Sequence, residues 1–392
     1  MKQELLSEIP AATPEPEYVF VETAAAWDLC LGELRSAPRF AVDIEANSLH
    51  AYREQICLIQ ISTETRDYII DPLAGLDLAG LGGLLGDARV EKVFHAADYD
   101  MSLLKSLYGW DVRHHFDTMW AGRVLGFKKM GLAVVLEEMF GVTLVKKYQK
   151  ANWGKRPLTA EQLSYARNDT HYLLPLRDAL EKRLLEAGCL EEAREIFEGE
   201  CLVEPMERIF DPESFWGVQG VRALSPRGQA IFRSLYIYRD EEARRRDMPP
   251  FKVVNDQMLL RIADEASRRR EKEPLGSVPG VSDKLLERLG RHLHQAVARG
   301  RRDAPPKQPR RRPPRHPNSP GFAQRYEALL EWRKRKAKER GVESDVIMPR
   351  RTAMELAEKN PATDGDLEQI ASLGPFRRKR YAGEILKTLR DC

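Results

Sequence analysis

The sequence predicts an α/β domain, in which helices flank a mixed sheet, followed by two small all-α bundles. Three features lead to this prediction. Short apolar runs alternate with helical patterns between residues 18 and 96, the pattern is helical from about residue 98 to 200, and the second half repeats a set of helical segments. At 392 residues the chain is long enough for two or three domains, each with its own hydrophobic core.

The first domain begins with five apolar runs of strand length. We expect a helix over residues 23–37, between the first two strands, and a further helical segment near 76–86. Short connections join the second, third and fourth strands, which favours antiparallel neighbours in a meander. The expected strands are YVFV (18–21), RFAVDIEA (39–46), QICLIQIS (55–62), DYIID (67–71) and VEKVFHA (90–96).

The clearest helix is predicted within residues 156–188, RPLTAEQLSYARNDTHYLLPLRDALEKRLLEAG. Thr159 is suited to the N-cap, Gln162 completes a capping box, and Gly188 ends the pattern. Leucines along one face indicate that this helix packs against the domain and is not solvent-exposed.

The second half contains an internal repeat. A shift of 94 residues places 238–266 on 332–360 and, without a gap, Gly280 on Gly374. Each copy predicts a basic helix, a loop and further short helices. Residues 301–320 hold seven Pro and seven Lys or Arg against one Asp, a composition that indicates an extended, disordered linker. The predicted division is a leader (1–16), the α/β domain (17–205), a first helical domain (218–300), the linker (301–320) and a second helical domain (321–392).

Charge is distributed unevenly along the chain. Residues 1–200 carry 22 Lys or Arg against 32 Asp or Glu, whereas residues 201–392 carry 41 against 28. An acidic front half and a basic back half suggest a catalytic module joined to one that grips a polyanion, although solvated basic helices would give the same composition. Five scattered cysteines without a C-x-x-C pair argue against a zinc site or a disulfide framework. Because neither a signal peptide nor a membrane-spanning apolar run is evident, we expect a cytoplasmic protein with no membrane partner.

Two carboxylates mark the second expected strand, AVDIEANS. Phe40, Val42 and Ile44 fall on one face of the strand, while Asp43 and Glu45 share the other. A half-solvated sheet face would explain such a pair. A hard cation would explain it too, since adjacent carboxylates repel each other unless they are neutralised.

Further acids follow at points where they could meet this pair. Asp98 and Asp100 lie where a strand gives way to a helix, at the strand's carboxyl end; Asp98 is expected to be a helix cap and Asp100 a candidate ligand. Tyr165 and Asp169 lie one turn apart on one face of the long helix. Four carboxylates, Asp43, Glu45, Asp100 and Asp169, could therefore converge on two divalent ions, Mg²⁺ or Mn²⁺, of the kind that promote phosphodiester hydrolysis.

These motifs resemble those of the DEDD exonucleases in their tyrosine subclass, and specifically of ribonuclease D. The resemblance rests on D-I-E at 43–45, Y-D at 99–100 and Y-A-R-N-D at 165–169, with QICLIQIS, KVFHAADYDMSLL and NWGKRPLTAEQLSYARNDTHYLLPL around them. The two repeats are similar to HRDC domains. The resemblance implies a ribonuclease H-like exonuclease domain followed by two HRDC bundles, and 3′→5′ hydrolysis of RNA to nucleoside 5′-monophosphates.

Residue roles follow from the same resemblance. Asp43, Glu45 and Asp169 would hold the metal that activates water, and Asp43 with Asp100 would position the second metal. Tyr165 would orient the attacking water, because the ordinary pKa of a tyrosine, near 10, makes it a better hydrogen-bonding group than a general base.

The expected partners are RNAs, namely tRNA precursors and other small structured RNAs, and no protein partner is evident. A cluster of basic residues before the third motif could grip phosphates, or could simply be solvated: Lys128, Lys129, Lys146, Lys147, Lys150, Lys155 and Arg156. A satisfied structural role is expected for His95, and a capping role for Asp117. Two alternatives stay open: a DNA-directed exonuclease of the same superfamily, and a non-catalytic RNA-binding scaffold. We expect truncation after about residue 210 to preserve chemistry on short single strands and to weaken binding of structured RNA.

Overall fold

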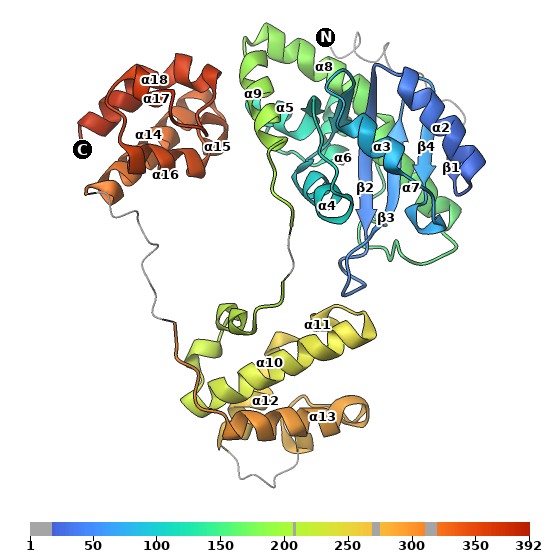
Figure 1. Cartoon of the computed structure of the whole chain (residues 1–392), viewed down its shortest axis with the longest axis vertical. Coiled ribbons are helices and arrows are strands. Elements are labelled where there is room, and N and C mark those ends of the chain that lie inside the picture. Colours follow the sequence, from blue (N-terminus) through green and yellow to red (C-terminus); the bar gives the residue numbers. More distant parts are fainter. Residues whose placement is uncertain (1–17, 207–208, 269–274, 310–319) are drawn as a thin grey trace. The chain divides into compact units, whose positions relative to one another are not determined.

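The computed structural model describes residues 18–206, 209–268, 275–309 and 320–392 (Figure 1). They form two compact units. The first comprises the described residues of 18–46, 56–206 and 320–392, and the second comprises 47–55 with the described residues between 209 and 309. The predicted leader and the middle of the predicted linker, 310–319, lie outside the described residues.

A six-stranded mixed sheet organises the first unit, in the order β1-β4-β3-β2-β5-β6. The predicted meander is confirmed, because β3 is antiparallel to both β2 and β4. β1 is parallel to β4, and β5 is parallel to β2 and to β6. The strands are β1 (Tyr18–Val21), β2 (Arg39–Ala46), β3 (Ile56–Ser62), β4 (Asp67–Ile70), β5 (Glu91–Phe94) and β6 (His115–Asp117).

The sixth strand was not predicted. Its three residues lie in a stretch that was expected to be helical throughout, and they are too few for an alternating pattern to show.

Helices cover both faces of the sheet. One core joins Phe40, Val42 and Ile44 of β2 to α2 (Ala24–Ser36), α3 (Ala79–Leu85) and α4 (Asp98–Tyr108). Ala41 and Val93 face the opposite way, into a second core. That core is built with α5 (Thr118–Val124), α6 (Leu132–Phe140), α8 (Leu173–Glu186) and α9 (Leu190–Glu200), while α7 (Ala160–His171) lies against β2, β3 and β4. Figure 1 shows α3 crossing in front of the strands. The predicted fold of helices flanking a mixed sheet is therefore confirmed.

The single helix expected over 156–188 is two helices, α7 and α8, which are separated at Tyr172. Pro175 lies in the first turn of α8, where its missing N–H does no harm. In the interior of one continuous helix the same proline would remove a hydrogen bond and clash with the preceding turn, which accounts for the break.

The predicted ends of this region are confirmed. Thr159 Oγ1 accepts a hydrogen bond from Gln162 N at 3.2 Å, and Gln162 Oε1 accepts one from Thr159 N at 3.1 Å, which completes the capping box. Gly188, at φ +63°, closes the C-terminal end of α8.

Two all-α bundles follow, as predicted. The first copy of the repeat contains α10 (Pro226–Arg246), α11 (Pro250–Val253), α12 (Asp256–Arg268) and α13 (Asp283–Arg302), preceded by the short turns η2 (Pro212–Gly217) and η3 (Val221–Ala223) and interrupted by η4 (Leu275–Ser277). The second copy contains α14 (Phe322–Arg340), α15 (Ser344–Ile347), α16 (Arg350–Lys359), α17 (Asp364–Leu367) and α18 (Pro375–Arg390). A further short turn, η1 (Pro72–Ala74), follows β4 in the α/β domain.

The 94-residue repeat is visible in single hydrogen bonds. In the first copy, the buried Arg239 donates from Nη1 to the carbonyl oxygen of Val254 at 3.1 Å. In the second copy, the buried Arg333 donates from Nη1 to that of Met348 at 2.8 Å. The donor and the acceptor in the second copy each lie 94 residues after those in the first, so the two bundles share one internal framework.

Within the described ranges, no helix combines the length and the apolar character needed to cross a membrane.

Candidate active site

Asp43 and Glu45 lie near the carboxyl end of β2. Their neighbours Val42 and Ile44 are buried in the core on the opposite face of the strand. The pairing of β2 with β3 shifts register directly after Glu45, at an irregularity of the kind that often re-aims side chains beside active sites. Alternation along β2 therefore places both carboxylates on the same face.

Asp100 reaches this edge of the sheet from the neighbouring strand. β5 runs parallel to β2, so the carboxyl ends of both strands lie at the same edge, where ligands commonly bind in α/β sheets. α4 starts after β5 and carries Asp100, which is 8% exposed, in its first turn. Asp117 accepts a hydrogen bond from Ala97 N at 2.8 Å and so ties down the start of this helix.

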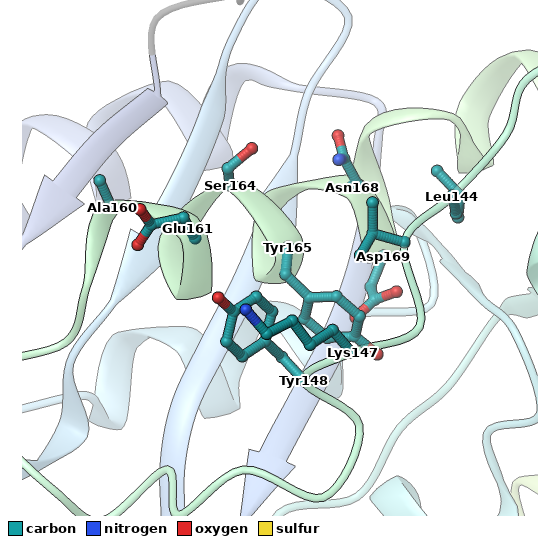
Figure 2. Close-up of a pocket in the computed structure, with 10 residues that line it drawn as sticks. Leu144, Lys147, Tyr148, Ala160, Glu161, Ser164, Tyr165, Asn168 and Asp169 are labelled. Atoms are coloured by element: carbon teal, nitrogen blue, oxygen red, sulfur yellow. The ribbon is translucent and has the colours of Figure 1, made fainter.

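Tyr165 and Asp169 come from α7. In Figure 2 both side chains extend from the helix to the same side, whereas Ser164 and Asn168 point the other way. Because α7 contacts β2, β3 and β4, this face of the helix meets the carboxylates of β2.

Three of the predicted ligands meet in space. One carboxylate oxygen from each of Asp43, Glu45 and Asp169 lies within 4.8 Å of the other two, although these residues come from a strand and from a helix far along the chain. Asp100 lies outside this group, but its charge is close enough to raise the pKa of Glu45.

The electrostatics of this acidic cluster favour a cation. Burial, followed by repulsion from Asp43, Asp169 and Asp100, raises the pKa of Glu45 to about 10. Burial and the charge of Asp43 raise the pKa of Asp169 well above its ordinary value, and likewise that of Asp100. Clustered carboxylates are the oxygen ligands that Mg²⁺ and Mn²⁺ prefer, so the residues fit such ions.

Comparison with known proteins identifies two domain families in the chain. A 3′-5′ exonuclease domain family matches residues 18–185, and the HRDC domain family matches residues 228–297 and 322–389. A ribonuclease D from Gluconacetobacter diazotrophicus is 30% identical over 289 residues, which are 73% of this chain and 72% of that relative. The chain belongs to the ribonuclease D family.

Two further comparisons show the extent of the likeness to ribonuclease D and its relatives. Exosome complex component 10 of Mus musculus is 36% identical over 258 residues, or 63% of this chain, but the chain spans only 28% of that relative's length. The crystal structure of Escherichia coli RNase D is 23% identical and covers 96% of this chain and 99% of its own, with a TM-score of 0.61. That likeness extends the shared fold through both HRDC copies.

In this ribonuclease D family member, aromatic residues surround Tyr165. The rings of Trp153 and Tyr148 each lie 6.0 Å from the ring of Tyr165, and Trp153 is 1% exposed. Burial, followed by the charges of Asp169, Glu45 and Asp43, raises the pKa of Tyr165 above its ordinary value, so its hydroxyl stays protonated at neutral pH. Tyr165 can therefore donate a hydrogen bond within the acidic cluster.

A cavity of about 420 Å³ opens beside Tyr165 and Asp169. Leu144, Val145, Lys147 and Tyr148 line it. Figure 2 shows Lys147 beside Tyr148. The Lys147 amino group lies 5.2 Å from the centroid of the Tyr148 ring. Sequence reasoning placed Lys147 in a basic cluster but missed Tyr148, although a tyrosine among lysines in KKYQK is the pattern that could have revealed it.

Two members of that basic cluster are engaged elsewhere. Arg156 binds both carboxylate oxygens of Asp71, and Lys128 donates to the carbonyl oxygen of Gly341 at 3.1 Å. Arg156 is therefore a structural residue, and the prediction that it could grip phosphate is wrong for the described conformation.

Three other expectations can be compared with the structure. His95 Nδ1 lies 2.9 Å from Thr118 Oγ1, in the structural role predicted for it. Asp117 caps α5 by accepting from Met119 N at 2.8 Å and from Trp120 N at 3.0 Å, also as predicted. Asp98 is not a cap: it lies inside α4, whose N-cap is Ala97. Its charge, after burial and the charge of Asp117, helps to raise the pKa of Glu200.

Proposed function

We propose that this protein is a metal-dependent 3′→5′ exoribonuclease that hydrolyses RNA to nucleoside 5′-monophosphates. The observation that carries the proposal is the meeting of Asp43, Glu45 and Asp169 within 4.8 Å, inside a 3′-5′ exonuclease domain. Three carboxylates that cluster without a Lys or Arg among the described residues of the group suit a site that is completed by divalent ions and by the phosphate of a substrate.

The acids divide between two ions in this proposal. Asp43, Glu45 and Asp169 hold the first, and Asp43 with Asp100 holds the second, directly or through water. Bound Mg²⁺ or Mn²⁺ would supply Lewis acidity for activating water and for stabilising the leaving oxygen. Asp43 is the shared ligand in this proposal because its charge, after burial, raises the pKa of both Asp169 of α7 and Asp100 of α4.

Tyr165 orients the attacking water through its hydroxyl group. A tyrosine whose pKa is raised above its ordinary value cannot act as a base at neutral pH. The protonated hydroxyl group can donate a hydrogen bond to the water. The packing of Trp153 against the Tyr165 ring holds the ring, and so the hydroxyl group, in one orientation.

The proposed substrates are the 3′ ends of tRNA precursors and other small structured RNAs. Support comes from the ribonuclease D relatives and from the Escherichia coli structure, described as that of an exoribonuclease involved in structured RNA processing. The HRDC copies, in a back half of 41 basic against 28 acidic residues, would add salt-dependent affinity for the phosphate backbone. A cytoplasmic location remains a prediction.

The test is digestion of a 5′-labelled single-stranded RNA and its DNA counterpart, with and without Mg²⁺ or Mn²⁺, beside an Asp43→Asn control. A metal-dependent ladder that shortens from the 3′ end of RNA, and that the control lacks, is expected. Preferential shortening of DNA would support the alternative that the protein is a DNA-directed exonuclease. Tight, salt-sensitive RNA binding without cleavage would support the scaffold instead.

A further inference from the structure

The second HRDC copy and the exonuclease domain belong to the same compact unit. Val346 of the second copy is fully buried in the core formed by α5, α6, α8 and α9 of the exonuclease domain. Val342 packs against that core and against the second copy's own core. Apolar contact therefore joins the two domains directly.

Buried ion pairs join them as well. Glu192 of α9, 1% exposed, binds Arg340 of α14 through both oxygens, at 2.6 Å to Nη1 and 2.7 Å to Nη2. Glu195, one turn further along α9, accepts from Arg377 Nη1 at 2.9 Å and from the backbone N–H of Phe376 at 2.6 Å. These contacts neutralise both acids of α9, which would otherwise be buried charges without partners.

Two other features adapt the second copy to α5 and α9. Asp345 of α15 pairs with Arg123 of α5. Gly374 lies so close to Glu195 that a Cβ atom at this position would lie 2.0 Å from the Glu195 carboxyl carbon. We call Arg340, Asp345, Gly374 and Arg377 the docking set.

The 94-residue repeat provides an internal comparison. The first copy has Phe251, 52% exposed, where the second has Asp345. The third residue of α13 is Leu285, whereas the third residue of α18 is Arg377. Arg246, the counterpart of Arg340, pairs with Glu242 inside its own helix. The framework arginines Arg239 and Arg333 are shared, but the docking set is complete only in the second copy.

We propose that the second HRDC copy is a constitutive part of the nuclease body, which recognises the acid pair Glu192 and Glu195 on α9. The functional nuclease module is then residues 18–206 together with 322–389, although the first copy separates them in sequence. The inference does not depend on the proposed reaction. It also revises the expectation for truncation after about residue 210, because such a chain would lose the partners of two buried acids and part of a shared core.

The test separates noncovalent docking from the covalent connection. A site for a specific protease is inserted between residues 310 and 319 of the full chain, the chain is cleaved, and the products are run on a size-exclusion column at micromolar concentration. The C-terminal fragment is expected to co-elute with the rest. Its elution as a separate peak in the otherwise native protein would overturn the proposal.

Variants then test the ion pairs. Glu192→Arg places like charges face to face and is expected to weaken fragment retention on the order of a hundredfold or more, whereas the reciprocal Glu192→Arg/Arg340→Glu chain should regain it. Arg246→Glu, the same change at the equivalent position of the first copy, should leave retention unchanged. If Glu192→Arg prevents folding, judged by elution of the uncleaved chain, Glu192→Gln takes its place. Full retention in every α9 variant would refute the recognition of this acid pair.

Discussion

Arg156 holds Asp71 through two hydrogen bonds, from Nε to Oδ2 at 2.6 Å and from Nη2 to Oδ1 at 2.7 Å. The same guanidinium group also donates to the carbonyl oxygens of Cys57 on β3, at 2.8 Å, and of Trp153, at 2.6 Å. Arg156 thus fastens the segment before α7 to the sheet, and this segment carries the tryptophan that packs against Tyr165.

Replacing Arg156 with Ala should therefore impair catalysis indirectly. The substitution leaves Asp71, which is 5% exposed, without its cation, and we expect a loss of about 3 kcal/mol in the free energy of unfolding. Turnover on RNA should fall while KM changes little, because Tyr165 loses its support but the substrate contacts remain. Arg89→Ala removes a surface pair with Asp87 and serves as the control, expected to be nearly neutral. An equal loss of turnover in both variants would contradict the positioning role.

Tyr165→Phe removes only the hydroxyl group. We expect kcat to fall by roughly 10²–10⁴-fold, the usual contribution of a positioned proton-handling group, with RNA affinity nearly unchanged. Single-turnover assays and filter binding measure the two quantities separately. Tyr172→Phe, at the junction of α7 and α8, is the matched control. An unchanged turnover rate in Tyr165→Phe would remove Tyr165 from the reaction.

The acidic cluster should cost stability when no metal is bound. Asp43→Asn relieves repulsion on Glu45 and Asp169, so we expect the metal-free variant to melt at a higher temperature than the unaltered protein while losing activity. Mg²⁺ at a hundred times its dissociation constant should stabilise the unaltered protein by about 2.7 kcal/mol and the variant by much less. A lower melting temperature of the metal-free variant would contradict this account.

The same repulsion predicts a pH dependence. Glu45 has a pKa of about 10 in the folded chain, above its ordinary 4.5, so its stabilising protonated form is fully present below pH 4.5 and is lost as the pH rises towards 10. The metal-free protein should therefore become less stable over this interval, and saturating Mg²⁺ should flatten the trend. Thermal unfolding at a series of pH values measures how stability changes with pH, once with a chelator and once with Mg²⁺. In the metal-free state, Asp43→Asn should lose less stability with rising pH than the unaltered protein.

The cavity beside Tyr165 should contribute to substrate binding. Tyr148 offers a ring face and Lys147 a positive charge, a combination suited to a nucleotide of a single strand. Tyr148→Ala should weaken binding by about 1–3 kcal/mol, the usual value of one stacked base, and raise KM more than it lowers kcat. Lys182→Ala, an exposed lysine on α8, controls for general charge effects beside Lys147→Ala. Unaltered KM in both pocket variants would exclude the cavity from the substrate path.

Patterns along the chain predicted the features that local chemistry determines. Alternation on β2 predicted the common face of Asp43 and Glu45, and the capping box predicted the start of α7. The break at Tyr172 was missed, although Pro175 marks it, because the apolar stripe continues through both helices. β6 was missed because three residues give no periodicity.

Contacts between distant segments could not be predicted in the same way. The carboxylate that binds Arg156 lies 85 residues earlier in the chain, and nothing near Arg156 indicates it. Glu200 meets Asp98 only after α9 has packed, so a capping role for Asp98 was reasonable from its local sequence. The attachment of the second HRDC copy to α9 depends on side chains whose partners are about 150 or more residues away.

The 94-residue shift superimposes Gly280 on Gly374, although Gly374 is the N-cap of α18 and Gly280 lies two residues before the N-cap of α13. The two residues are glycines for different reasons. Gly280 has φ +84°, a backbone conformation that Asn can also adopt, while Gly374 has φ −66°, which suits any residue, and is confined instead by the Glu195 carboxyl group. Evolutionary drift should therefore admit different replacements at the two sites: Asn at the first, and no side chain at the second while α9 keeps its glutamate. An alignment that superimposes the two copies would place both glycines in one column. The different constraints on the two positions would then be read as a single requirement for glycine, and the replacements that each position tolerates would be misjudged.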